Sequence, residues 1–329
     1  MSLIKAERRR FLKRRLTVWM LAIGILILAA ITTGLALTHE KPTPQTIAAA
    51  EAEAEAFYQQ QVKEFERFRA ECEAQAGAVA AGKCMGPERE WFKAEHFMPP
   101  QFAFKEMFGE LLIAWAAIIA MVGFVLGATF VGAEWSSGAM MNLLTWRPKR
   151  LTVLGTKLGV VLGWMAGVGV VTFGLWTAGL YAVGKISGNT TGMTSGTWQS
   201  FGLSGLRGVA MILAFTAIGF GLASIGRHTA LALGVAIAVV IVGQIGLSIV
   251  LDLANVPFFE RYLIPVHMYT WLNKQVTLED FSGPVNCDMN GCDAPKLVLQ
   301  YADTGYMALA AVAAVLVIAF FTMKRRDVA

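Results

Sequence analysis

Six apolar runs, each long enough to cross a lipid bilayer, constrain this sequence more than any other feature. They cover residues 17–37, 111–131, 153–184, 205–226, 229–251 and 303–323. A helix of about 20 apolar residues spans the hydrocarbon core of a bilayer. Because no water is available inside that core, the backbone must satisfy its own hydrogen bonds, which favours helices. The sequence therefore predicts an all-α integral membrane protein with six transmembrane helices.

Nearly all charged residues lie between these runs, and charged residues make up only 16% of the chain. Soluble domains usually carry about 25% charged residues. The net charge of +5 arises from cations that lie next to the apolar runs. This placement indicates contact with a lipid bilayer and no nucleic-acid partner.

The distribution of Lys and Arg predicts the orientation of the spans. Cations are concentrated in residues 1–16, 132–152 and 324–329, whereas segments 38–110, 185–204 and 252–302 are together net acidic. Loops rich in Lys and Arg remain on the cytoplasmic side. We therefore predict that both termini are cytoplasmic and that two large segments, 38–110 and 252–302, lie outside. The predicted location is the plasma membrane of a bacterium.

Residues 1–16 combine cations with four apolar side chains that are candidates to face lipid: Leu3, Ile4, Phe11 and Leu12. Two interpretations remain open for this segment. It is either a plain orientation signal or an amphipathic helix lying along the inner leaflet, where anionic lipids attract its arginines. The following run is too long for the core of a signal peptide, so we expect it to be retained as the first span.

The cytoplasmic loop, residues 132–152, contains a short segment with helical periodicity. Ala139, Met140, Leu143 and Leu144 fall on one face, which predicts an amphipathic helix at the membrane surface. Trp135 and Trp146 have side chains that suit the membrane interface. Pro148 is expected to end this helix. The alternative is an ordinary basic loop.

The order of residues in and after this loop resembles the cytoplasmic segment of the ABC-2 superfamily, the permease subunits of one class of ABC exporters. The matching positions are Glu134, Gly138, Leu143, Leu144, Pro148, Arg150 and Lys157. The resemblance implies a coupling helix that docks on a separate ATPase (nucleotide-binding) subunit, which would hold ATP and Mg²⁺. It also implies a second permease protomer, in a homodimer or a heterodimer. Glu134, Arg147 and Arg150 would then pair with the partner or with one another.

Four glycines repeat at every fourth position of the third run: Gly155, Gly159, Gly163 and Gly167. Small residues at this spacing allow a second helix to approach closely. We expect the stripe to pack against another span of this chain, with a second protomer as the alternative.

All four cysteines, Cys72, Cys84, Cys287 and Cys292, fall in the two large outer segments. An even number of cysteines on the oxidising side of a membrane favours disulfides. Cys72–Cys84 with Cys287–Cys292 is the simplest of the three possible pairings. The spacings match none of the usual zinc patterns, so no metal site is predicted.

The chain has none of the motifs that would make it an enzyme by itself. The Gly-x-x-x-x-Gly-Lys runs at residues 77–83 and 179–185 are followed by Cys84 and Ile186, so the chain contains no complete phosphate-binding Gly-x-x-x-x-Gly-Lys-Ser/Thr sequence. It also contains no His-Glu-x-x-His and no Gly-x-Ser-x-Gly. We predict no catalytic residue and no cofactor in this chain. The predicted spans also contain few ionisable side chains, which carriers driven by an ion gradient require. Energy is therefore expected from outside the chain.

Together these features predict the permease of an ATP-driven exporter. It would move a hydrophobic or amphiphilic substrate outward by alternating access. The alternative is a membrane anchor or sensor that acts through the outer segments and transports nothing. An intramembrane enzyme is disfavoured because catalytic groups are lacking.

Overall fold

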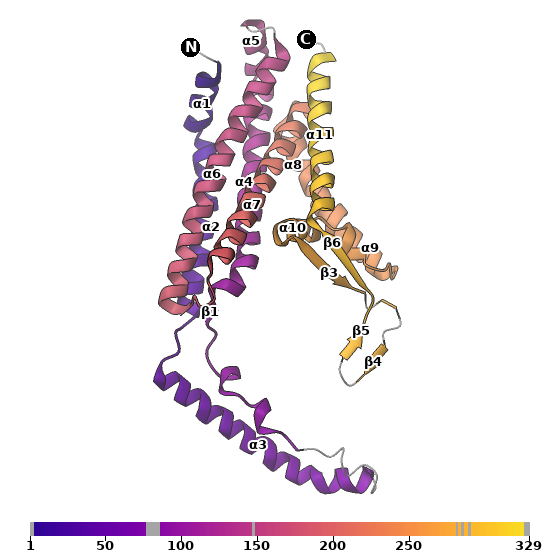
Figure 1. Cartoon of the computed structure of the whole chain (residues 1–329). Helices are drawn as coiled ribbons and strands as arrows, with labels where there is room; N and C mark the ends of the chain where they lie inside the picture. The colour runs from indigo at the N-terminus through magenta and orange to yellow at the C-terminus, as the bar shows by residue number, and fades with distance from the viewer. Residues whose placement is uncertain are drawn as a thin grey trace. The chain divides into compact units, whose positions relative to one another are not determined.

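The computed structural model describes residues 3–76, 86–146, 149–280, 282–283, 286–288 and 291–325 (Figure 1). Within this part of the chain, six helices are long and apolar enough to cross a membrane, as predicted. They are α2 (Arg15–Thr38), α4 (Phe104–Ser136), α6 (Arg150–Ser187), α7 (Ser195–Gly226), the continuous helix Thr229–Leu253 and α11 (Tyr301–Arg325). The fifth of these consists of α8 (Thr229–Ala238), the π-helical stretch η4 (Val239–Gly246) and α9 (Leu247–Leu253).

Several spans extend beyond the apolar runs. α4 continues to Ser136, so residues 132–136 are helical although the sequence predicts a loop. α7 begins at Ser195, inside the predicted outer loop, because Thr194 caps it by accepting a hydrogen bond from the Thr197 backbone N–H at 3.3 Å. Such a cap satisfies one of the N–H groups left free at a helix start. The helices end where a cap or a turn stops them, and hydropathy alone does not report those positions.

The chain divides into two compact units. The first contains Met1–Ala30, Lys105–Gly179 and Gly192–Ala329, and the second contains Ile31–Phe104 and Leu180–Thr191.

Glycines bring α4 and α7 into close contact in the first unit. A Cβ atom at Gly127 would collide with the backbone oxygen of Thr216, and one at Gly219 would collide with that of Phe124. Elsewhere on α4, the fully buried Trp115 donates from Nε1 to the Thr172 hydroxyl of α6 at 3.0 Å. The α4–α7 pair is therefore joined backbone to backbone, the kind of packing that small residues permit.

The glycine stripe of α6 does not make this kind of contact. A Cβ atom at Gly159, Gly163 or Gly167 would meet no described atom within 4 Å, and one at Gly155 would meet only the Phe320 ring, at 3.9 Å. The expectation that the stripe packs against another span of this chain is therefore wrong for these three glycines. The four-residue spacing shows that the glycines share one helix face, but it does not show whether that face contacts another helix.

The second unit contains the predicted outer helix. α3 (Pro44–Ala76) matches the helix expected from the Ala-, Glu- and Gln-rich composition. Its Phe57 ring packs against the rings of Phe92 and Phe97, with centroids 5.7 and 5.8 Å away. These rings flank two short 3-10 helices, η2 (Arg89–Trp91) and η3 (Ala94–His96). In the same unit, β1 (Phe102–Ala103) pairs in parallel with β2 (Gly188–Asn189).

The segment 252–302, predicted to lie outside, contains strands that were not predicted. After η5 (Phe259–Tyr262) and α10 (Ile264–Asn273), β3 (Gln275–Glu279) pairs antiparallel with β6 (Lys296–Gln300). A smaller hairpin joins β4 (Asn286–Asp288) to β5 (Gly291–Asp293). β3 and β6 both alternate between exposed and half-buried residues. This period of two is visible in the sequence of β3, whereas β6 places the apolar Val298 at an exposed position.

We predict a disulfide between Cys287 and Cys292. The two residues are directly opposite in the β4–β5 register. Opposite residues in an antiparallel pair have Cα atoms about 4.5–5.5 Å apart, which lies within the span of a disulfide. Mass spectrometry of non-reduced peptides should recover the two cysteines linked, and free thiols at both positions in protein purified without reductant would contradict this. Cys84 lies outside the described residues, so its pairing with Cys72 stays a sequence prediction.

Candidate functional site at the α1, α4 and α6 ends

Three charged side chains are buried together where α1 (Leu3–Lys13), α4 and α6 meet. The Lys157 ammonium lies 2.7 Å from a Glu7 carboxylate oxygen and 2.7 Å from a Glu134 carboxylate oxygen. The Lys157 and Glu7 side chains are 0% and 1% exposed, and that of Glu134 is 9% exposed. One lysine thus joins three segments that are far apart in sequence.

Aromatic rings enclose this ion cluster. The Lys157 nitrogen lies 5.2 Å from the centroid of the Phe130 ring, and the Arg14 guanidinium lies 5.6 Å from the same centroid. Phe11 packs edge-on against Phe130 with centroids 5.3 Å apart, and it is only 2% exposed. The prediction that Phe11 faces lipid is therefore wrong, because α1 turns this residue toward the bundle. Ile4 and Leu12 of α1 are exposed, as the amphipathic pattern predicts.

Cations outnumber carboxylates in and around the cluster. Glu7 and Glu134 lie among Lys157, the neighbouring Arg14, and Arg10, whose guanidinium lies 3.7 Å from a Glu7 carboxylate oxygen. Arg14 donates a hydrogen bond to the Thr129 carbonyl at 3.1 Å. Burial lowers the pKa of Arg14, while the Glu134 and Glu7 carboxylates act in the opposite direction. Removing charges from water is costly, so such a group is stable only when every member is paired.

This arrangement corrects the role predicted for Glu134. The resemblance implies a charge that pairs with Arg147, Arg150 or a partner protein. The structure instead buries Glu134 in the last turns of α4 and pairs it with Lys157 of the same chain. Glu7 was not predicted to belong to this ion cluster. Its position as the single acid in a strongly basic segment could have indicated that it pairs with a cation.

The predicted amphipathic helix is present as α5 (Ala139–Trp146). Its Met140 and Leu144 side chains are buried, and Leu143 is half-buried. On other parts of its surface, Asn142 is exposed and Trp146 is 87% exposed. α5 is therefore held by one face and leaves another free. Arg147 and Pro148 lie outside the described residues.

Gly138 forms the turn between α4 and α5. Its φ of +71° is a left-handed conformation that glycine adopts without strain. The Gly138 N–H donates to the Trp135 carbonyl at 3.2 Å, and its own carbonyl accepts from the Asn142 N–H at 3.2 Å. A Cβ atom here would meet nothing within 4 Å, so backbone conformation explains this glycine and close approach does not.

The end of α4 is also braced by contacts with Arg227 and Thr229. Gly132 lies so close to Thr229, at the start of α8, that a Cβ atom would stand 2.6 Å from the Thr229 backbone nitrogen. The Arg227 guanidinium lies 4.8 Å from the Trp135 ring centroid. Trp135 is thus half-buried beneath an arginine. These contacts and the ion cluster fix the last turns of α4 within the first unit.

Six membrane-spanning helices, with a short amphipathic helix between the second and third, define a multi-pass membrane protein of the transport-permease type. The chain belongs to the family described as ABC-2 family transporter protein, whose model matches residues 1–328. No curated protein matches the chain. ABC-2 permeases are membrane transport components, generally not catalytic themselves, and they normally work with an ABC ATPase subunit.

Proposed function

We propose that this chain is the transmembrane permease subunit of an ATP-driven exporter, with α5 as its coupling helix. A separate ATPase subunit would bind ATP and Mg²⁺, and a second permease protomer, identical or different, would complete the transport pathway. The observation that carries the proposal is the placement of α5. It lies between two spans, buries Met140 and Leu144, and leaves Trp146 exposed for a partner.

The ion cluster supports a route by which force would pass from α5 to the spans. Lys157 of α6 holds Glu134 of α4, so the helices on both sides of α5 are clamped near their ends. A displacement of α5 would therefore move α4 and α6 together. Paired motion of this kind would drive alternating access. The apolar spans are compatible with a hydrophobic or amphiphilic substrate.

The proposed orientation places both termini and α5 in the cytoplasm of a bacterial cell. α1, α5 and the end of α11, all in the first unit, lie at one end of its helices (Figure 1). Each belongs to or adjoins a cation-rich segment, which favours the cytoplasmic side.

Cysteine labelling tests this orientation. In a background with the native cysteines replaced, the exposed Ser136 is changed to cysteine, and the exposed Thr277 of β3 provides the matched control. A membrane-impermeant thiol reagent applied to intact cells should label Thr277→Cys and leave Ser136→Cys unlabelled. Labelling of Ser136→Cys alone would invert the arrangement.

Docking through α5 is tested by Trp146→Ala. An exposed tryptophan that becomes buried against a partner commonly contributes 2 kcal/mol or more to binding, roughly a thirtyfold change in affinity. We expect the variant to insert normally and to retain far less ATPase subunit on co-purification. Trp91→Ala removes a ring that is 58% exposed in the outer segment and is the matched control. Full retention in the Trp146 variant would indicate that the ring contacts lipid instead.

A further inference from the structure

The fifth span changes its helical form in the middle. α8 and α9 are α-helical, whereas η4 (Val239–Gly246) between them is a π-helix, in which a backbone N–H bonds to the carbonyl five residues earlier. At the end of η4, for example, the Leu247 N–H donates to the Val242 carbonyl. π-helical stretches are rare and often mark functional sites. η4 is therefore the place where this span can change its hydrogen-bonding register.

Packing holds only the first end of this span. At that end Gly132 of α4 closely approaches Thr229. Every residue of η4 and α9 is described, and none of them is buried. Apart from Gln244, Ser248 and Asp252, the side chains of these two stretches are apolar or absent. A rotation of η4 and α9 about the helix axis would therefore exchange one apolar contact with lipid for another.

Gln244 is the residue whose surroundings such a rotation would change most. Its Oε1 accepts a hydrogen bond from the backbone N–H of Ile264 at 2.6 Å, and its Nε2 donates to the Gly243 carbonyl at 2.9 Å. Ile264 is the first residue of α10, and the first N–H groups of a helix have no partner within it. The N-cap residue Leu263 provides no side-chain cap. Gln244 thus caps α10 from the fifth span.

The last turn of α10 is fixed to a different helix. Trp271 donates from Nε1 to the Arg207 carbonyl of α7 at 2.8 Å. The Ser204 hydroxyl of α7 donates to the Leu272 carbonyl at 3.1 Å, and the Leu272 side chain is fully buried. α10 therefore joins α7 at its end to the fifth span at its beginning. Loss of the Gln244 hydrogen bond would release only the beginning.

We propose that Gln244 and the Ile264 N–H form a latch that the register of η4 controls. A change of η4 from π-helical to α-helical bonding shifts the register by one residue, which corresponds to about 100° of rotation in a helix of 3.6 residues per turn. This rotation turns the Gln244 amide away from Ile264 and frees the first turn of α10. In the proposed orientation α10 lies at the outer surface, so the latch would control opening there during export. Only that role rests on the proposed function, and the latch itself needs no ATPase.

Hydrogen–deuterium exchange of the full chain in lipid nanodiscs tests the latch. Gln244→Leu keeps an unbranched Cβ and a similar volume but removes the acceptor. Loss of one hydrogen bond should speed exchange in peptides covering residues 259–268 by about two- to tenfold. Ser248→Ala is the matched control, because the Ser248 hydroxyl donates to the Ile245 carbonyl of its own span at 2.8 Å. It should exchange like the wild type. A wild-type rate in Gln244→Leu would overturn the latch.

Deletion of Val240 tests the part played by η4. With one residue fewer, the span can form α-helical hydrogen bonds throughout while Gln244 keeps its place beside Ile264. No register change then remains to release α10, so residues 259–268 should exchange more slowly than in the wild type. Exchange at the wild-type rate or faster would show that the register of η4 does not release α10, and it would contradict the proposal.

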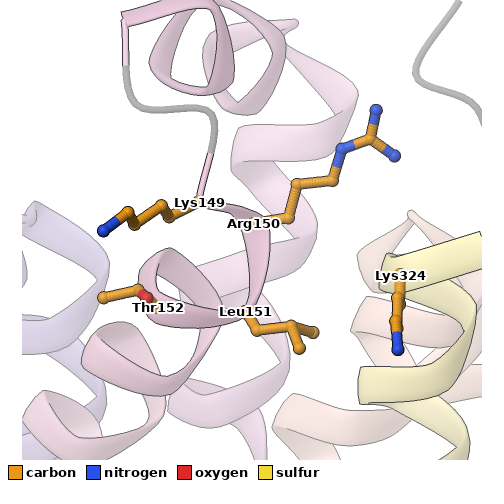
Figure 2. A pocket seen from close by; sticks show the side chains of 5 residues that line it. All are labelled: Lys149, Arg150, Leu151, Thr152 and Lys324. Carbon is orange, nitrogen blue, oxygen red and sulfur yellow. The ribbon is translucent and has the colours of Figure 1, made fainter.

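A control for general loosening lies near the end of α11. A pocket of about 330 Å³ between the start of α6 and the end of α11 shares no residue with the latch, and its lining residues are Lys149, Arg150, Leu151, Thr152 and Lys324 (Figure 2). Leu151→Ala shortens a side chain that is 42% exposed at this pocket. It should leave exchange of residues 259–268 unchanged. The same acceleration in Leu151→Ala and Gln244→Leu would reduce the effect to a loss of overall stability and overturn the latch.

Discussion

Replacing Lys157 with methionine is expected to destabilise the folded chain by about 3–5 kcal/mol, the cost of removing one partner from a buried ion pair. The substitution leaves the Glu7 and Glu134 carboxylates buried without their shared cation. Thermal unfolding of the purified protein in detergent would show a strongly lowered midpoint. A midpoint within error of the wild type would contradict the buried cluster.

The matched control breaks an exposed pair. Lys296 lies 3.1 Å from Glu279 across the β3–β6 hairpin, and the two side chains are 55% and 43% exposed. Lys296→Met should therefore cost about 1 kcal/mol or less. Adding Glu7→Gln and Glu134→Gln to Lys157→Met removes the stranded charges and should recover part of the lost stability. Failure of that triple variant to recover anything would show that packing of the lysine stem, and not charge pairing, holds α1 in place.

Gly127→Ala should destabilise the chain by about 1–3 kcal/mol or more, because the added methyl group has no room. At this position a Cβ atom meets the backbone of Thr216 and lies 3.2 Å from the backbone nitrogen of Phe220, so no side-chain rotation relieves the clash. Gly163→Ala has the same chemistry on the open face of α6 and should remain within about 1 kcal/mol of the wild type. Unfolding midpoints of both variants in detergent decide the matter. Equal destabilisation by Gly163→Ala would indicate that this face of α6 contacts a neighbour that is not among the described residues.

The six spans could be predicted because a helix that crosses the hydrocarbon core must be predominantly apolar along its whole length. Hydropathy is a local property, so residues 17–37 and 303–323 are recognised without knowledge of their neighbours. α5 was predicted for the same reason, since its apolar face is visible within eight residues. The β3–β6 hairpin was not predicted, although polar and apolar residues alternate in β3. A strand of five residues is too short to form one of the long apolar runs.

The buried ion cluster could not be predicted from the local pattern. Glu7 and Lys157 are separated by 150 positions, and only the folded arrangement of α1 and α6 brings them together. Glu134 and Lys157 were identified by resemblance, but their burial depends on how far α4 continues as a helix. The glycines illustrate the same limit. Gly123 and Gly127 have the same spacing as Gly159 and Gly163, yet only the first pair meets another helix among the described residues.

Gly138 connects these structural features to the proposed mechanism. Its left-handed conformation sets the direction in which α5 leaves α4, and residues with a Cβ atom are strained there. Gly138→Leu should therefore tilt or loosen α5 without disturbing the buried cluster. The expected result is a permease that inserts and folds but transmits little force.

ATP hydrolysis by the reconstituted complex tests coupling most directly. The chain is incorporated into lipid nanodiscs with the ABC ATPase subunit that co-purifies with it, and hydrolysis is measured for each component alone and for the complex. We expect no hydrolysis by this chain alone, stimulated hydrolysis in the complex, and loss of most of that stimulation with Gly138→Leu. Wild-type stimulation in the Gly138 variant, or a wild-type complex that hydrolyses ATP no faster than the ATPase alone, would contradict the proposed coupling.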